Sequence, residues 1–500
     1  MRLSLRPTAS IAALAVALAT ACDLGAGSGR AEVVLSVGYA APAEAGGLNQ
    51  LIAPLTGEGL VRTGLNGRVE PVLADFWKID PSGTTITMNL RQDVAFHDGS
   101  PMTADDVKAS LERLLESPGQ IARNPVLGDI QSIEPDGRHR VVIHLAHPAA
   151  RQVLFELGVP VDKDGQGTGP FFVESTTDDE TTLRANPHYY LGRSEIDTVR
   201  IITYSTLRTA WAAMMRSEID FLFDVPIEAR EFVEADSSVR VFSHDTPYAY
   251  ALLFNTRRPP FDDHRARVAL SYAIDREAII GGALRGYGSV ASGIWPSHWV
   301  YDGVERTFDH DPQKADRQLS EIGLQRCVSA DQGSTRRCRS RLRFQALVID
   351  RPRFEPIALL VQKQLRQIGV EMEIDARPFA EVMSRIRNDS WDATLLPINT
   401  ARNLGRLYTY WHTSQPTAVS GFTGANGVLE SLRSSVTEDD MRTSATKFQR
   451  LLFEAAPAVF LTGLQDARAV SRRFVVPDEP GRDILETLWK WRVADQASAN

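Results

Sequence analysis

Acidic residues next to a histidine are the first candidates for chemistry in this sequence, because a carboxylate can orient an imidazole that acts as a general base. His97 and Asp98 are adjacent in the segment FHDG, and Asp105 and Asp106 follow shortly after it. Adjacent residues in a tight turn rarely face each other, so we interpret HDG as a structural turn. Asp105 and Asp106 fall in the first turn of a predicted helix, where they complement the helix dipole. Neither pair predicts catalysis.

The sequence motifs of several enzyme classes are missing. The sequence has no GxSxG nucleophile elbow, no HExxH zinc helix, no GxxxxGK[ST] phosphate loop and no CxxC pair. In GQGTGP, the phosphate-binding pattern GxGxxG fails because Pro170 occupies the last position. The histidines are spread singly and lack metal-ligand spacing. We therefore predict that the protein is not an enzyme and holds no metal or cofactor, with an extracytoplasmic hydrolase as the less favoured alternative.

Arginines and aromatic residues instead indicate binding. Arg402 and Arg406 lie in a stretch, 393–413, that contains no acidic residue. An arginine in such a stretch can pair bidentately with a carboxylate or a phosphate, although both side chains could equally point into solvent. Trp295 and Tyr408 lie in predicted loops, where an aromatic ring can stack on an organic ligand, and burial in a core is their alternative role.

The N-terminal segment has the pattern of a secretory signal. Two arginines precede a short apolar stretch that ends in small residues before Cys22. The apolar stretch is well below the roughly 20 residues that span a membrane. A cysteine at this junction resembles a bacterial lipoprotein signal, although Ala19 stands where leucine is usual. We predict a signal peptide over 1–21, a lipid on Cys22 and a flexible tether over 22–32. Ordinary cleavage that leaves Cys22 unmodified is the alternative.

The two remaining cysteines, Cys327 and Cys338, occur in the polar segment CVSADQGSTRRC. A secreted protein meets conditions that permit disulfides, and no histidine nearby would complete a metal site. We predict that these two cysteines form a disulfide. Closing so short a loop would contribute about 3 kcal/mol under the loop-entropy model.

Composition is that of a soluble globular protein. The chain has 500 residues, 43% hydrophobic and 24% charged residues, and a net charge of −8. This length allows about three domains. A negative charge without a basic run argues against a nucleic-acid surface.

The segment 77–115 can be interpreted element by element. The stretch ITMNL (86–90) alternates apolar and polar residues, which is typical of a half-buried strand. Thr103 and Asp106 have capping-box spacing before an apolar stripe at helical spacing.

A βαβ unit is predicted further along the chain. RLRFQALVI (341–349) suits a strand, apolar residues over 357–368 fall on one helical face, and Gly369 can cap that helix before a second strand over 370–374. A crossover helix between two strands implies that they are parallel. The patterns also predict helices over 379–387 and 438–455 and a strand over 391–398.

Several segments, in the same order along the chain, resemble those of one known family. LRQDVAFHDGSPMTADDV is similar to the pattern LRxxVxFxDGxPxTAxDV of extracellular solute-binding proteins of family 5, the receptors of peptide and nickel ABC importers. Five further segments resemble that family in the same order: LTGEGLVRTGLNGRVEPVLADFW, GTGPFFVE, ANPHYYLGRSEIDTVRI, MMRSEIDFLFDVP and YALLFNTRRPPFDDHRARVALSYAIDREAII.

The resemblance implies an α/β fold of the periplasmic-binding-protein type, with two lobes and an extra domain inserted in the first lobe. Lobe I would contain 33–54, 167–246 and 462–500. The inserted domain would be 55–166, and lobe II would be 247–461.

The resemblance also implies a function. The protein would be a monomer that captures a small-molecule or oligopeptide-like solute between its lobes. It would deliver the solute to an ABC permease and its ATPases, in the periplasm or on the outer face of the cell membrane, held by the lipid anchor. A chemosensory or chaperone-like periplasmic receptor is the alternative. The identity of the solute and of the permease does not follow from the sequence.

The ligand-binding residues expected from the resemblance and the patterns above are Tyr39, Gly167, Thr168, Gly169, Tyr248, Tyr250, Asn255, Trp295, Asn399, Arg402 and Tyr408. Peptide-binding members use an aspartate after the βαβ unit to pair with the ammonium group of the peptide. Alignment places Ala401 near that position here. We therefore expect that ordinary peptides are not held by their amino terminus.

Overall fold

The computed structural model describes residues 30–40, 47–294, 297–304, 306–326, 340–400, 402–477, 479 and 482–494. The chain divides into a unit Met1–Glu32 and a compact unit Val33–Asn500, and every element below belongs to the second unit. The predicted signal peptide, Cys22, Trp295, Cys327 and Cys338 lie outside the described residues.

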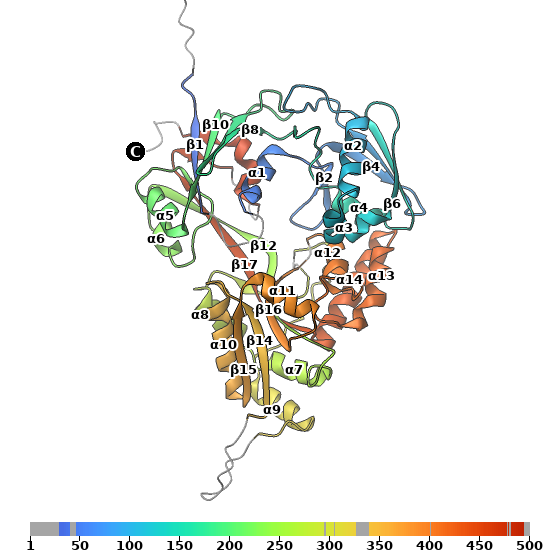
Figure 1. Cartoon of the computed structure of the whole chain (residues 1–500), viewed down its shortest axis with the longest axis vertical. Helices are drawn as coiled ribbons and strands as arrows, with labels where there is room; N and C mark the ends of the chain where they lie inside the picture. The colour runs from blue at the N-terminus through green and yellow to red at the C-terminus, as the bar shows by residue number, and fades with distance from the viewer. Residues whose placement is uncertain are drawn as a thin grey trace, which may run out of the picture. The chain divides into compact units, whose positions relative to one another are not determined.

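One mixed sheet runs through the second unit (Figure 1). Its strands are, in spatial order, β15 (Val370–Arg377), β14 (Leu342–Ile349), β16 (Ala393–Asn399), β12 (Val239–Phe254), β17 (Ala458–Ser471), β11 (Phe221–Leu222), β1 (Val34–Ala40), β10 (Thr198–Tyr204), β9 (Glu180–Ala185) and β8 (Phe171–Thr176), and β13 (Ser289–Val290) pairs with β17.

The long strands β12 and β17 join the two ends of this sheet. They pair with each other in antiparallel fashion, from Val239 opposite Ser471 to Leu253 opposite Ala458. Their register shifts between Asp245 and Ala249, where Pro247 has no N–H to donate to the ladder. The predicted lobe limits at 246 and 462 fall inside these two strands, and the domain limits stay a prediction.

The predicted βαβ unit is confirmed. β14 and β15 are parallel, with Leu342 opposite Val370, and α10 (Phe354–Gln367) connects them. Gly369 has φ of +79°, a left-handed conformation that glycine adopts without steric cost, and this lets the chain turn from the helix into β15. The predicted helix over 379–387 is α11 (Phe379–Arg387), and the predicted strand over 391–398 is β16.

The segment 60–161 forms a hydrophobic core of its own. Four strands build its sheet in the order β4 (Ala74–Ile79), β5 (Thr85–Leu90), β7 (Arg140–Leu145) and β6 (Ile130–Pro135), and β2 (Val61–Thr63) pairs with β3 (Val69–Pro71). The alternation predicted over 86–90 is confirmed, since Ile86, Met88 and Leu90 are buried in β5. Its helices are α2 (Ala104–Leu115), α3 (Pro118–Arg123), the 3-10 helix η1 (Pro125–Asp129) and α4 (Ala150–Glu156).

The capping box predicted at the start of α2 is confirmed. The backbone N–H of Thr103 donates to the carboxylate of Asp106 over 2.9 Å, and the N–H of Asp106 donates back to the Thr103 hydroxyl over 3.4 Å. These two bonds satisfy groups that a helix end leaves without partners, which explains why α2 starts where it does.

The remaining helices pack on the large sheet or on one another. They are α1 (Asn49–Thr56), α5 (Leu207–Met215), α6 (Arg230–Glu234), α7 (His264–Tyr272), α8 (Arg276–Ala283), α9 (Pro312–Glu321), α12 (Gly405–Trp411), η2 (Thr423–Ala425), α13 (Asn426–Arg433), α14 (Glu438–Ala455) and η3 (Ile484–Lys490), and a short pair of strands, β18 (Phe474–Val475) and β19 (Arg492–Val493), lies near the C-terminus. α14 has the bounds predicted for it.

Candidate ligand-binding site

A cavity of about 430 Å³ lies at the carboxyl ends of β14 and β16, beside the middle of β12. The carboxyl ends of parallel strands are where open α/β sheets commonly bind ligands. Its lining residues are Gln50, Thr246, Tyr248, Tyr250, Ile349, Arg351, Arg353, Phe354, Phe379, Met383, Leu396, Pro397, Ile398, Tyr410, Thr417, Val419, Leu464 and Asp466. We call it the apolar cavity, because most of these side chains are hydrocarbon or aromatic.

The walls of the apolar cavity expose aromatic surface that packing would normally cover. Phe379 begins α11 and is 46% exposed, and Tyr248 on β12 is 38% exposed. Tyr250 lies on the same face of β12, because side chains alternate along a strand, but it is buried edge-on against Phe354 with ring centroids 5.0 Å apart. A fixed inner wall is thus combined with open aromatic surface at which an apolar group could bind.

Two arginines in the apolar cavity have different surroundings. Arg353 lies between two carboxylates, 3.3 Å from Asp466 and 3.4 Å from Asp224. Arg351 follows the end of β14, and its backbone is fixed by an N–H···O bond of 2.8 Å to Ile349. Within the described part of the chain, no carboxylate pairs with the Arg351 side chain. Arg351 is therefore the cation of this cavity whose charge the described residues leave unpaired.

Two of the predicted ligand-binding residues, Tyr248 and Tyr250, line this cavity. Asn399 is opposite Tyr248 in the ladder between β12 and β16, at the edge of the lining. Arg402 lies outside the lining, and its guanidinium donates to the carbonyl oxygen of Asp245 over 2.7 Å. Burial lowers the pKa of Arg402, with Glu486 and Asp245 acting in the opposite direction.

The turn at Gly167, Thr168 and Gly169 lies away from the apolar cavity and forms a structural joint. The Thr168 hydroxyl is buried and donates to the carboxylate of Glu58 over 3.2 Å. The carbonyl oxygen of Gly169 accepts from the amide of Asn186 over 3.0 Å. A Cβ added to Gly169 would lie 2.6 Å from the carbonyl carbon of Thr56, so the close approach of two backbones requires glycine.

Two other predicted residues, Asn255 and Tyr39, are part of the packed interior. The Asn255 amide donates to the Asp389 carboxylate over 2.8 Å and to the Trp391 carbonyl oxygen over 3.1 Å. Tyr39 is buried with its ring 5.8 Å from that of Phe223. The structure places both outside the lining of the apolar cavity.

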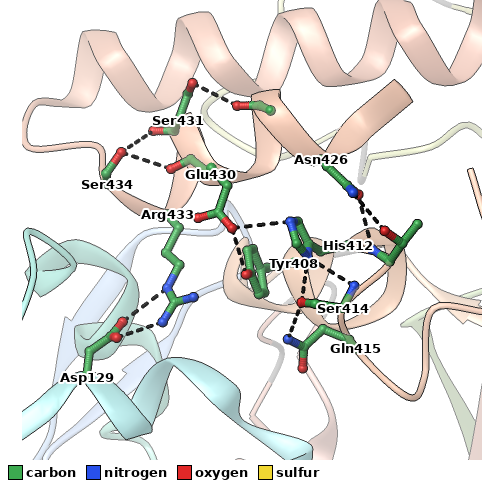
Figure 2. Close-up of polar contacts among 12 residues, drawn as sticks. Asp129, Tyr408, His412, Ser414, Gln415, Asn426, Glu430, Ser431, Arg433 and Ser434 are labelled. Atoms are coloured by element: carbon green, nitrogen blue, oxygen red, sulfur yellow. Dashed lines mark hydrogen bonds and ion pairs between the residues drawn. The ribbon is translucent and has the colours of Figure 1, made fainter. Parts of the chain in front are cut away.

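Tyr408 belongs to a polar cluster between α12, α13 and η1 (Figure 2). Its hydroxyl donates to Glu430 over 2.9 Å, and its ring stacks on His412 with centroids 4.4 Å apart. In the same cluster, Arg433 makes a bidentate pair with the buried Asp129, with N···O distances of 2.6 and 3.1 Å. Tyr408 therefore packs α12 against α13, and Arg433, whose guanidinium lies 4.9 Å from the centroid of the Tyr408 ring, makes the contact to the segment 60–161.

A second cavity, of about 360 Å³, lies between the start of the segment 60–161 and η3. We call it the polar cavity; it is lined by Pro54, Gly57, Glu58, Gly59, Val61, Arg62, Thr63, Pro71, Val72, Arg91, Gly158, Pro170, Tyr189, Tyr190, Leu191, Glu479, Arg482, Leu485, Glu486, Thr487, Trp489 and Lys490.

Glu58 is a partly buried acid of the polar cavity. It accepts from the hydroxyls of Tyr189 over 3.0 Å and Tyr190 over 3.1 Å, in addition to that of Thr168. Burial raises the pKa of Glu58 to about 7, although the three hydroxyl donors and nearby Arg91 favour its charged form.

Sequence reasoning missed Arg351, Phe379, Met383 and Asp466 as lining residues. A usable signal existed for Arg351, since it lies two residues after the end of a predicted strand of a βαβ unit and so falls at the carboxyl edge of the sheet. Asp466 lies on β17, more than a hundred residues along the chain from Arg351, and no local pattern connects the two.

Neither a metal centre nor a membrane span is found in the part of the chain that the structure describes. No three His, Cys, Asp or Glu side chains are grouped there to hold a metal ion. None of the helices described combines the length and the apolar composition needed to cross a bilayer.

Comparison with known proteins gives consistent results for sequence and fold. The model of the bacterial extracellular solute-binding proteins of family 5 matches residues 68–418. The chain is 27% identical over 346 residues to the glutathione-binding protein GsiB of Salmonella paratyphi A, an alignment that covers 66% of this chain and 65% of GsiB, just under two thirds of that relative.

Solved structures show the same two-lobe fold. NikA of Brucella suis, determined in complex with Fe(III)-EDTA, superposes with a TM-score of 0.79 at 18% identity over 93% of this chain and 100% of NikA. The oligopeptide-binding protein AppA of Bacillus subtilis, in complex with a nonapeptide, superposes with a TM-score of 0.72 at 21% identity, covering 93% of this chain and 100% of AppA. The family model covers well over half of the chain, and so the chain belongs to the bacterial extracellular solute-binding proteins of family 5.

Proposed function

We propose that this protein is the substrate-binding component of an ABC importer, which captures a solute in the apolar cavity and delivers it to a membrane permease driven by its ATPases. The observation that carries the proposal is the origin of the cavity's walls. Gln50 and Asp466 come from segments assigned to lobe I, whereas Arg351 and Phe379 come from the segment assigned to lobe II. A solute bound among these four residues would contact both lobes.

Such contacts would couple binding to closure. A ligand shifts a conformational equilibrium only by its difference in affinity for the two states, and a solute touched by both lobes favours the closed one. The register shift between β12 and β17 at residues 245–249 supports a hinge there, because an interrupted ladder bends more easily than a regular one.

Mass spectrometry of small molecules released from gently purified, unfolded protein tests the binding role. The released solute, added back at about 100 times its dissociation constant, should raise the free energy of unfolding by roughly 2.7 kcal/mol and reduce the radius of gyration in X-ray scattering. Stabilisation without compaction would contradict a two-lobe clamp. Crosslinking in membranes should recover the permease, and its absence from the crosslinked partners would contradict delivery to an importer.

The attachment to the membrane is part of the proposal. A lipid on Cys22 followed by the tether over 22–32 would keep the receptor at the outer face of the membrane within reach of the permease. Cys22→Ser should then move the protein from the detergent phase to the soluble fraction. Unchanged partitioning would refute the lipid anchor.

A disulfide between Cys327 and Cys338 is also part of the proposal. Peptide mapping without reduction should recover the two cysteines as one linked pair, and recovery as two alkylated thiols would refute the disulfide.

A further inference from the structure

We propose that the apolar cavity selects an organic monoanion with a bulky apolar body. This rests on the proposed function, because it names the class of solute that the same cavity would take. Three features of the cavity carry it: its charge, the chemistry of its walls and its volume.

The charges in the apolar cavity sum to one unmatched cation. Arg353 is held between Asp466 and Asp224, so its charge is compensated within the protein. Arg351 lines the same cavity and pairs with no carboxylate of the described residues. A guanidinium can donate two parallel hydrogen bonds to a carboxylate, which makes an anionic group on the ligand its natural partner.

An ammonium group has no comparable partner. Asp466 is the carboxylate that lines the apolar cavity, and it already accepts from the guanidinium of Arg353 over 3.3 Å. A cationic solute would have to displace that arginine and would also meet Arg351. The cavity therefore discriminates against amines and against peptides held by a free amino terminus.

The walls call for hydrocarbon rather than hydroxyl groups on the ligand. Beyond the charged residues and the tyrosines, the polar side chains of the lining are Gln50, Thr246 and Thr417. A sugar carries a hydroxyl on nearly every carbon, and each would lose water without gaining a partner here. The exposed rings of Phe379 and Tyr248 instead offer surface that an aromatic or aliphatic body would cover.

The volume limits the size of the ligand. A cavity of about 430 Å³ is in the range of sites that enclose a single compact organic molecule. A molecule the size of a blocked dipeptide with two apolar side chains would fill this volume. A small acid such as N-acetylglycine would leave the aromatic side chains of the walls in contact with water.

Titration calorimetry with four matched probes tests the inference. N-acetyl-phenylalanyl-leucine carries a carboxylate and an apolar body, its C-terminal amide removes the charge, phenylalanyl-leucine amide reverses the charge, and N-acetylglycine removes the body. We expect the first probe to bind at least tenfold more tightly than each of the others, since charged hydrogen bonds and apolar burial are each worth about a factor of ten or more. No heat from the first probe, or equal affinity for acid and amide, would overturn the inference.

Two variants test whether Arg351 binds the carboxylate of the acid probe. Arg351→Gln should weaken the acid at least tenfold and leave the weak affinity of the amide unchanged, because only the acid uses the charge. The matched control is Arg366→Gln, the same change on the exposed end of α10 outside the cavity, which should alter neither. Equal losses in both variants would mean that overall charge, and not the cavity, attracts the acid.

The outcome of the solute release experiment separates this inference from the proposed function. A released amine or sugar that binds tightly and compacts the protein would refute the monoanion and leave the receptor role standing. A protein that binds the acid probe but neither compacts nor crosslinks to a permease would contradict the receptor role and leave the chemistry of the cavity standing.

Discussion

The apolar cavity and the polar cavity have similar volumes, about 430 and 360 Å³, but their charged side chains have different surroundings. In the polar cavity two of the cations form ion pairs: Arg482 lies 3.1 Å from Glu70 and 3.5 Å from Glu479, and Lys490 lies 2.9 Å from Glu479. Arg91 makes no ion pair among the described residues, but its side chain donates to the Val72 carbonyl oxygen over 2.8 Å and lies 5.1 Å from the centroid of the Tyr190 ring. In the apolar cavity Arg351 has no such partner among the described residues. Volume alone therefore does not separate the two cavities; the difference used in the proposal is the Arg351 side chain, which pairs with no described carboxylate.

Glu58 has a structural role in the polar cavity. Its carboxylate accepts hydrogen bonds from the hydroxyls of Thr168, Tyr189 and Tyr190. These bonds link the start of the segment 60–161 to the part of the chain that follows that segment. Removing such a group should affect folding, whereas changes in the apolar cavity should affect affinity. Four experiments test this division, from the largest expected effect to the smallest.

The pH dependence of stability should report Glu58. Its pKa is raised from 4.5 to about 7 by burial, so folding favours the protonated acid. The resulting stabilisation of the folded protein is about 3 kcal/mol. It is fully present below about pH 4.5 and is lost as the pH rises through about 7. Denaturant unfolding of wild type and Glu58→Gln at several pH values should show this fall in the wild type and a flatter profile in the variant. Identical profiles would contradict the assignment.

Removing one hydroxyl from the same cluster should destabilise the protein by about 1–2 kcal/mol, because hydrogen bonds to ionisable groups are among the stronger ones. Tyr190→Phe is the suitable change, since the ring keeps its packing and its contact with Arg91, 5.1 Å from the ring centroid. The free energy of unfolding at pH 8, where Glu58 is charged, gives the measurement. Loss of affinity for the acid probe in this variant would break the division between the two cavities.

The opposite pattern is expected for Phe379→Ala in the apolar cavity. Because Phe379 is 46% exposed, removal of its ring should change the free energy of unfolding by less than about 0.5 kcal/mol. Affinity for N-acetyl-phenylalanyl-leucine should fall by about 1 kcal/mol through lost apolar contact. A large loss of stability with unchanged affinity would show that Phe379 is a structural residue.

Asp466→Asn should have the smallest effect and the opposite sign. It removes a negative charge next to Arg353, so the cavity becomes more positive and the acid probe should bind more tightly by about 0.5–1 kcal/mol at low salt. The gain should shrink at high ionic strength, which calorimetry at two salt concentrations can measure. Weaker binding of the acid would indicate that Asp466 contacts the ligand directly.

The sequence predicted those parts of the fold that local rules decide. The capping box at Thr103, the alternation over 86–90 and the βαβ unit depend on residues close together in the chain, and each occurs where it was predicted. The two-lobe fold was predicted from six sequence segments that resemble the family and occur in the same order along the chain.

The lining of the apolar cavity was predicted only in part, because its walls come from distant segments. Tyr248 and Tyr250 were identified, but Asn255 and Thr168 have buried polar side chains that the interior itself satisfies. Polar residues near a predicted cleft look alike in sequence whether they bind a ligand or one another. Only the three-dimensional pairing separates Arg351 from Arg402, whose guanidinium donates to the Asp245 carbonyl oxygen.

The segment 60–161 is joined to the helices after β16 by two buried acids. Asp129 pairs with Arg433, and Glu156 accepts from Asn403 over 2.8 Å and lies 3.2 Å from Arg406. Breaking a buried pair by removing one partner costs about 3–5 kcal/mol. A chimera that receives this segment from another family member would therefore inherit partnerless charges unless the residues at positions 403, 406 and 433 are exchanged with it. The segment is contiguous in sequence, but these contacts couple its exchange to residues outside it.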